Sequence, residues 1–179
     1  MSQQQKIRKI AYMGMYLALY FVLDWLTHTV PLFKMPQGGS LGLSVLALLL
    51  ASYHLGWKQG VLVGLLSVLL QFMTGQVYIV QNSDGFTLWQ IVLQFLMEYP
   101  LAFGVYGLSS LFKNYKGFYT GILVTGMIRL ALHVIAGHYY WGSPWWASFT
   151  YNAWYMIPTT LFALVVVPLL LPRLKYLFK

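Results

Sequence analysis

I-A-Y-M-G-M-Y-L-A-L-Y-F-V-L-D-W, residues 10–25, contains no charged side chain before Asp24 and directly follows the basic residues Lys6, Arg8 and Lys9. A helix needs about 20 apolar residues to cross the roughly 30 Å of hydrocarbon in a bilayer, because it rises about 1.5 Å per residue. The stretch therefore predicts a membrane helix. No small-residue cleavage site follows it, so we expect a retained helix rather than a signal peptide.

The rest of the chain has the same character. Of its 179 residues 59% are apolar and only 8% are charged, and both values are far from the averages of soluble domains. We therefore predict an all-α membrane protein, a single integral membrane domain over residues 1–179 built as a six-transmembrane-helix bundle. The expected helices cover residues 8–26, 41–56, 59–75, 88–112, 117–138 and 150–171.

Basic residues gather at the ends of the apolar runs rather than along one solvated face, which argues against a nucleic-acid partner. If the helices alternate in direction, one side of the membrane holds Lys6, Arg8, Lys9, Lys58, Lys113, Lys116, Arg173, Lys175 and Lys179. The opposite side holds only Lys34 and Asp84. By the positive-inside rule both termini are cytoplasmic, and the loops near 27–40, 76–87 and 139–150 face outside. The chain has no cysteine, which excludes disulfides and thiolate metal sites.

Two features of the first helix and its loop have more than one interpretation. Ala11, Gly14 and Ala18 are spaced by three and four residues and share a face on which another helix backbone could approach closely. That face serves either internal packing or a partner subunit. In the loop 31–40, the pair Gly38-Gly39 permits unusual backbone angles, so the loop is a candidate lid or short re-entrant turn.

Glu98 is the one acidic residue of the expected fourth helix, and Arg129 is the one lysine or arginine of the expected fifth. Counting residues from the outer helix ends places both roughly 14 Å below the outer boundary, at 1.5 Å per residue. A charge at such depth costs on the order of 2.5–3.5 kcal/mol on insertion scales, so each side chain should face the bundle and have a partner. One interpretation is a structural Glu98–Arg129 ion pair, and the other is a functional site.

Further polar and aromatic residues belong to the same outer half. His133 stands one turn outward from Arg129, and Asn152 begins the last helix. The tryptophans and tyrosines of residues 139–146 either form an interfacial belt or stack on a flat ring. Together these residues suggest an outward-facing pocket for a small, nitrogen-rich aromatic molecule. No G-x-x-x-x-G-K-[ST] phosphate loop is present, so any ATP-driven step would belong to a partner.

Four short motifs, in this order and spacing, resemble those of the thiamine-specific substrate-binding subunits of energy-coupling factor transporters. They are M-P-Q-G-G-S at 35–40, E-Y-P-L-A-F at 98–103, R-x-x-x-H-x-x-x-G at 129–137 and S-F-T-Y-N-x-x-Y-x-x-P at 148–158. The resemblance extends from about residue 10 to residue 158. It implies a multi-pass protein of the bacterial cell membrane, surrounded by lipid, that captures thiamine and docks on a transmembrane coupling subunit with two ATPase subunits.

The resemblance also implies roles for individual residues. Glu98 and Asn152 would hold the aminopyrimidine edge, while His133 and Trp141 would contact the ligand, Trp141 by stacking. Tyr99 and Tyr78 are further matches, and Ala11, Gly14 and Ala18 would dock the coupling subunit. Arg129 would support the site from behind it. The resemblance implies neither a catalytic residue, nor a cofactor, nor a metal.

The chain departs from the family pattern at one position. Some relatives have a binding tyrosine five residues before the asparagine, where this chain has Ala147. Trp146 or Tyr151 would then compensate, or the pocket would take a smaller ring such as a vitamin B6 form. Two other classes of function stay open as alternatives: an intramembrane enzyme using Glu98 and His133, and a transporter that works without an ATPase.

Overall fold

The structure, a computed structural model, describes residues 3–34 and 40–177 and is helical in each of the six predicted ranges. The predicted range 88–112 is a continuous helical segment in four parts: α4 (Leu88–Leu96), the π-helical turn η3 (Met97–Leu101), α5 (Ala102–Gly104) and the 3₁₀ stretch η4 (Val105–Leu111). The other helices are α1 (Gln3–Thr29), α2 (Val45–Leu55), α3 (Trp57–Met73), α6 (Thr120–Tyr139) and α7 (Trp145–Leu177). The described residues form no strand, so the all-α prediction is confirmed.

In the part of the chain that the structure describes, four helical segments are long and apolar enough to cross a membrane: Gln3–Thr29, Leu88–Leu111, Thr120–Tyr139 and Trp145–Leu174. The other two, α2 and α3, are apolar but have only 11 and 17 residues. The predicted start of α2 at residue 41 is wrong by four residues. There the Gly42 N–H donates to Thr159 Oγ1 of α7 at 2.9 Å, and this bond fixes the segment before α2 in a non-helical path.

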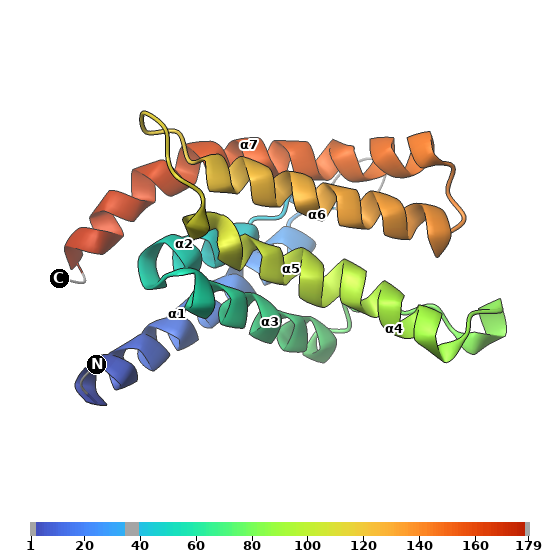
Figure 1. The fold of residues 1–179 in the computed structure, drawn as a ribbon, viewed down its shortest axis with the longest axis horizontal. Coiled ribbons are helices and arrows are strands. Elements are labelled where there is room, and N and C mark those ends of the chain that lie inside the picture. The colour runs from blue at the N-terminus through green and yellow to red at the C-terminus, as the bar shows by residue number, and fades with distance from the viewer. Residues whose placement is uncertain (1–2, 35–39, 178–179) are drawn as a thin grey trace.

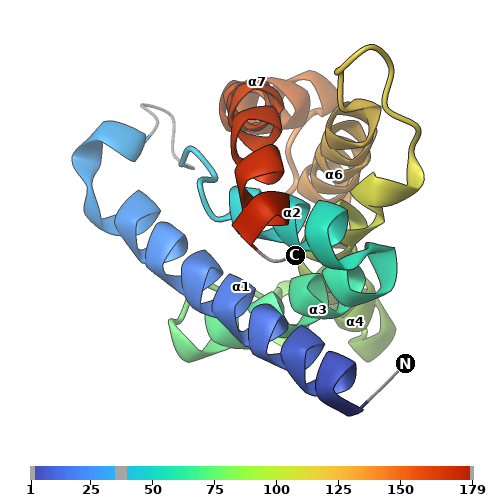
Figure 2. The ribbon, with the colours of Figure 1, turned by 90° about the vertical axis from the view of Figure 1, so that its left-hand side faces the viewer.

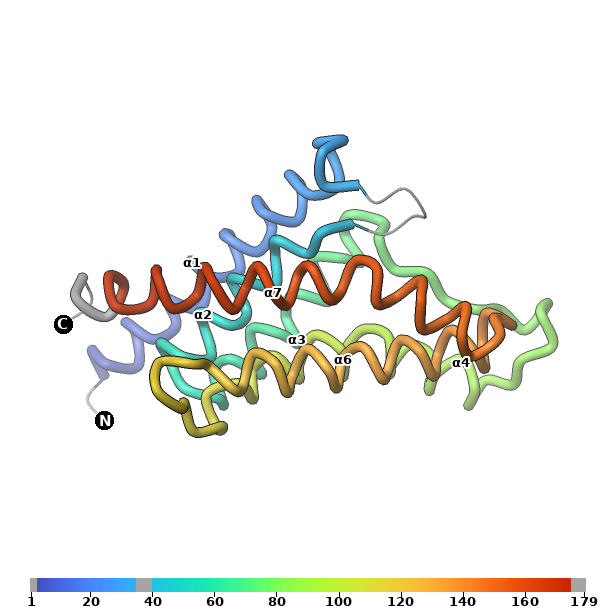
Figure 3. Tube along the Cα trace, turned by 90° about the horizontal axis from the view of Figure 1, so that it is seen from above, coloured from blue at the N-terminus to red at the C-terminus, as the bar shows by residue number. Residues whose placement is uncertain are grey.

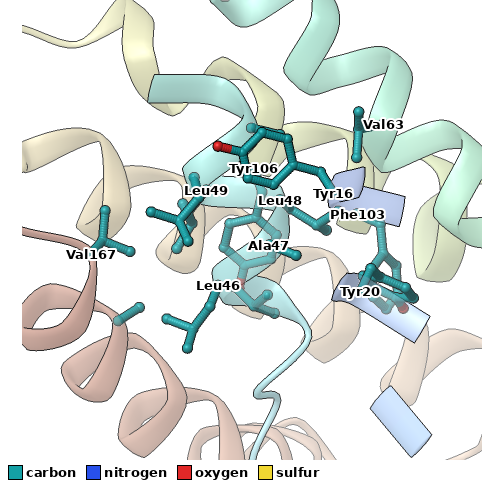
Figure 4. Close-up of a cluster of buried hydrophobic side chains, with 14 of the residues drawn as sticks. Tyr16, Tyr20, Leu46, Ala47, Leu48, Leu49, Val63, Phe103, Tyr106 and Val167 are labelled. Carbon is teal, nitrogen blue, oxygen red and sulfur yellow. The ribbon is translucent and has the colours of Figure 1, made fainter. Parts of the chain in front are cut away.

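The short helix α2 forms the centre of the bundle. Its residues Val45–Ser52 are all buried, and α1, α3, η4 and α7 pack against it. Figure 2, which looks along the long axis, shows α2 in the middle with the longer helices around it. In Figure 4 its side chains Leu46 and Leu48 lie among Tyr20, Phe103 and other core residues. An apolar helix buried on all sides is stabilised mainly by removal of its surface from solvent and by close packing.

All the connections rich in basic residues lie at one end of the molecule. At that end α1 begins, α7 ends, α2 turns into α3, and residues 112–119 connect to α6 (Figures 1 and 3). The tight turn at 115–118 has left-handed backbone angles at Lys116 and Gly117, φ 46° and 82°. The connections 74–87 and 140–144 lead to the opposite end. The predicted separation of basic and aromatic loops is therefore seen in the fold.

The small-residue face of α1 lies on the outside of the bundle. Ala11, Gly14 and Ala18 are exposed, and a Cβ placed on Gly14 would meet no atom within 4 Å. The interpretation that these residues pack internally is therefore wrong. Gly64 of α3 differs, because its Cβ would lie 2.6 Å from the Phe103 carbonyl oxygen.

This contrast predicts opposite effects of the same substitution. Gly64→Ala should destabilise the protein by about 1–3 kcal/mol, because the methyl group forces α3 away from α5. Gly14→Ala is the matched control and should be neutral or stabilising by up to about 1 kcal/mol, since alanine favours helix and has open space there. Thermal unfolding of both variants in one detergent checks the prediction. Equal melting temperatures would show that the α3–α5 contact is not tight.

Candidate functional site

Glu98 lies in the π-helical turn η3, beside Pro100. A proline in a regular helix lacks the N–H for the carbonyl four residues earlier and clashes with it, and a widened turn relieves that clash. Glu98 Oε1 accepts a hydrogen bond from Trp141 Nε1 at 3.0 Å, and Oε2 accepts one from Gln94 Nε2. The carboxylate therefore joins the α4–η4 segment to the connection between α6 and α7.

Tyr99, the next residue, is buried and anchors the loop that precedes α4. Its hydroxyl accepts a hydrogen bond from the Tyr78 N–H at 2.7 Å, and its ring stacks on Phe95 at 5.7 Å. Gln94 Nε2 also donates to the Tyr78 carbonyl at 3.1 Å. These bonds hold the Tyr78 backbone beside Glu98, although the Tyr78 side chain itself is exposed.

Arg129 and His133 project from successive turns of α6 toward the same interior space. The Arg129 guanidinium carbon lies 4.4 Å above the Phe103 ring and 5.5 Å from the centroid of the Tyr106 ring. Neither Arg129 Nε nor His133 Nε2 has a hydrogen-bond partner among the described residues. Of the two interpretations of this pair, the structural Glu98–Arg129 ion pair is wrong, because no oxygen of Glu98 lies within 4.0 Å of the guanidinium. The aromatic face of Phe103 supports the guanidinium instead.

Asn152 is buried on α7 and its side chain is held on both ends. Its Nδ2 donates to the Ser148 carbonyl at 2.9 Å, and its Oδ1 accepts from the Tyr155 hydroxyl at 2.7 Å. Ser148 in turn donates through Oγ to the Val134 carbonyl at 2.9 Å, which ties α7 to α6. Such contacts fix the orientation of the amide before any ligand binds.

These side chains enclose two adjoining cavities that share Tyr78, Glu98, Tyr99, His133 and Tyr155. We call the one with a volume of about 470 Å³ the outer chamber; it is also lined by Trp141, Tyr151 and Asn152. We call the other, of about 290 Å³, the inner chamber; it is also lined by Asp24, Ser44, Gln71, Arg129 and Thr159. Their combined size suits a small two-ring ligand.

The structure brings most of the predicted site residues together but leaves out Trp146. Trp146 is 73% exposed, stacks on Phe149 and lines neither chamber, as expected for a residue of the interfacial belt. Ala147 is also exposed and outside both linings, whereas Tyr151 and Tyr155 lie inside. Of the two residues expected to compensate for Ala147, Tyr151 therefore lines the outer chamber and Trp146 does not.

The residues that line the chambers and that sequence reasoning missed include Asp24, Ser44, Gln71 and Tyr155. A signal was available for Asp24, because an ionisable residue inside an apolar helix is a functional candidate by default. Tyr155 is part of the S-F-T-Y-N-x-x-Y motif but had no role assigned to it. Ser44 and Gln71 carry no sequence signal that separates them from other polar residues in apolar surroundings. The loop residues 35–39, which contain the candidate lid glycines, lie outside the described residues.

Comparison with known proteins gives consistent matches. A family model described as thiamine transporter protein matches residues 10–179. The chain is 28% identical to the thiamine transporter ThiT of Bacillus subtilis (strain 168), and the alignment covers 97% of each protein. A solved structure of ThiT from Listeria monocytogenes superposes with a TM-score of 0.71 at 20% identity, covering 97% of this chain and 98% of that one. At that identity the superposition shows a shared fold.

Proposed function

Because the chain belongs to the thiamine transporter protein family, we propose that it is the substrate-binding subunit of an energy-coupling factor transporter. The members of this family are multi-pass bacterial membrane transporters rather than enzymes. The proposed subunit captures thiamine from outside the cell. A transmembrane coupling subunit and two ATPase subunits then drive uptake. The chain has no phosphate loop of its own, so ATP hydrolysis belongs to the partners.

The observation that carries the proposal is the arrangement around Glu98 in the outer chamber. Glu98 offers carboxylate oxygens, Asn152 an oriented amide and Trp141 a flat aromatic face, and all three line the same cavity. The aminopyrimidine ring of thiamine presents N–H donors, ring-nitrogen acceptors and a flat face, and these groups complement that set. The inner chamber continues from this point and has room for the second ring.

The fold supports a definite topology for the proposed subunit. We place the end rich in basic residues in the cytoplasm, with both termini, because positive residues favour that side. The chambers then open toward the outside. In this topology the six helical segments all belong to the membrane domain, and the short helix α2 reaches only part of the way across, since 11 residues rise about 16 Å.

The exposed small-residue face of α1 is the proposed docking site for the coupling subunit. Ala11, Gly14 and Ala18 leave a shallow strip where a second helix backbone could approach closely. In hydrocarbon, helices associate through such close packing rather than through exclusion of water. Within residues 3–34 and 40–177 no atom lies within 4 Å of a Cβ at Gly14, which supports the use of this strip by a partner.

Intrinsic tryptophan fluorescence tests the proposal. Titrating the purified protein with thiamine should quench emission in a saturable way, because the ligand stacks on Trp141. Trp141→Phe should remove most of that quench, whereas Trp146→Phe, the matched control outside both chambers, should retain it. No saturable response up to millimolar thiamine would contradict a binding role. A quench that survives in Trp141→Phe would show that the ligand contacts another tryptophan.

A further inference from the structure

Asp24 is a buried carboxylate that lines the inner chamber and has no role in the proposed contacts to the aminopyrimidine ring. It lies on the buried face of α1 together with Tyr16, Tyr20 and Thr27, and it is only 8% exposed. Its Oδ1 accepts a hydrogen bond from Ser44 Oγ at 3.1 Å, and its side chain lines the inner chamber. A carboxylate at such a position costs free energy, so its retention calls for a compensating partner.

The charges that line the two chambers do not balance. Asp24 and Glu98 are two of the three acidic residues in the chain. Arg129 is the only lysine or arginine among the described residues that line either chamber, and it forms no ion pair with them within 4.0 Å. The side chains that line the chambers thus include two carboxylates and one guanidinium, besides the imidazoles of His28 and His133. The site therefore complements a monovalent cation.

The two carboxylates are not equivalent. Both oxygens of Glu98 already accept hydrogen bonds from side chains, one from Trp141 and one from Gln94. Asp24 accepts one side-chain hydrogen bond, from Ser44, and its other oxygen lies 3.7 Å from the half-exposed imidazole of His28. Glu98 therefore acts mainly as a hydrogen-bond acceptor with a fixed orientation. Asp24 acts mainly through its negative charge, whose electric field extends across the inner chamber.

Resting on the proposed function, we propose that Asp24 is a specificity residue that supplies the counter-charge for the cationic ring of thiamine. The quaternary nitrogen of a thiazolium ring has no N–H and cannot lose its charge, so a site recognises it through negative charge and aromatic faces rather than hydrogen bonds. With Asp24 ionised, the occupied chambers carry no net charge. With a neutral residue at this position, binding the cation would leave one uncompensated positive charge in a medium of low dielectric constant.

The test measures charge preference rather than affinity alone. Two ligands are compared in detergent-purified protein: thiamine, and an uncharged analogue in which a thiophene ring replaces the thiazolium ring. Asp24→Asn should weaken thiamine binding at least tenfold and analogue binding less than threefold. Asp24→Glu keeps the charge and should keep the preference for the cation. Asp84→Asn, a variant of the acidic residue outside both chambers, should change neither Kd.

A second variant gives an effect of the opposite sign. Arg129→Met removes the one guanidinium of the inner chamber and should raise the preference for thiamine over the uncharged analogue at least threefold, whatever it does to stability. Equal losses for both ligands in Asp24→Asn, or no loss, would overturn the inference while leaving the proposed function intact. A wild-type protein that fails to bind thiamine would instead overturn the proposed function itself.

Discussion

Replacing Glu98 by glutamine should raise the Kd for thiamine by about 30-fold or more, since disrupting one member of a buried charged hydrogen-bond network costs about 2–5 kcal/mol. The carboxylate accepts hydrogen bonds from both Trp141 and Gln94. A glutamine has only one acceptor oxygen, so its amide N–H would face one of these donors and leave it unpaired. Isothermal titration calorimetry of the purified variant measures the change.

The matched control for this variant is Asp84→Asn. Asp84 accepts a hydrogen bond from the Gln81 N–H in a surface turn and lines neither chamber. Its substitution should change the Kd by less than about threefold, because the site lies elsewhere. Unchanged thiamine affinity in Glu98→Gln would show that Glu98 does not bind the ligand. Thermal unfolding of both variants separates loss of binding from loss of fold.

Replacing Gly14 by leucine should abolish uptake while leaving ligand binding intact. Among the residues that the structure describes, none has an atom within 4 Å of a Cβ at Gly14, so the isolated protein can accommodate a larger side chain on the exposed strip of α1. A partner helix packed against the same strip cannot, because a leucine would separate the two backbones. In cells that supply the coupling and ATPase subunits, uptake of labelled thiamine should fall at least tenfold, on the order of the loss that 1.4 kcal/mol produces in an equilibrium.

Gly14→Ala is the control for the docking prediction, because alanine keeps the strip shallow and should preserve most of the uptake. Both variants should bind thiamine in detergent with a Kd within about threefold of the wild-type value. Normal uptake by Gly14→Leu would place the coupling interface on another face. Loss of thiamine binding by Gly14→Leu would show that the strip is coupled to the chambers.

The sequence predicts the helices well because their signal is a single physical quantity, the length of an apolar run. It predicts the start of α2 less well, since that boundary depends on the hydrogen bond between Gly42 and Thr159, which are distant in the chain. The motif residues Glu98, His133 and Asn152 are brought together as predicted. Their spacing places each of them in the half of its helix that lies away from the basic end of the molecule.

The interpretation of Glu98 and Arg129 as an ion pair fails for a simple geometric reason. Counting residues along a helix gives the depth of a side chain but not the direction in which it points. Arg129 points toward Phe103 and Tyr106, whose aromatic faces stabilise a guanidinium without a carboxylate. For the same reason the sequence cannot show that Trp141 lines the pocket and Trp146 does not. Residues of an interfacial belt and of the pocket lie at a similar depth and differ only in the direction of the side chain.

Asp24 could have been found from the helical period of α1. Tyr16, Tyr20, Asp24 and Thr27 recur at intervals of four, four and three residues, which places them on one face. Tyrosines facing the core beside a carboxylate indicate a polar interior rather than a lipid-facing surface. The partner Ser44 was beyond prediction, because its distance from Asp24 depends on how α2 is placed between α1 and α7.

The π-helical turn at Met97–Leu101 has a consequence for comparing this chain with distant relatives. In a regular α-helix, residues five apart are turned about 140° past one full revolution, so Glu98 and Phe103 would face different neighbours. The wider turn reduces that angle, and both residues line the inner chamber. An alignment gap placed between these two positions would therefore misassign every inward-facing residue on one side of it.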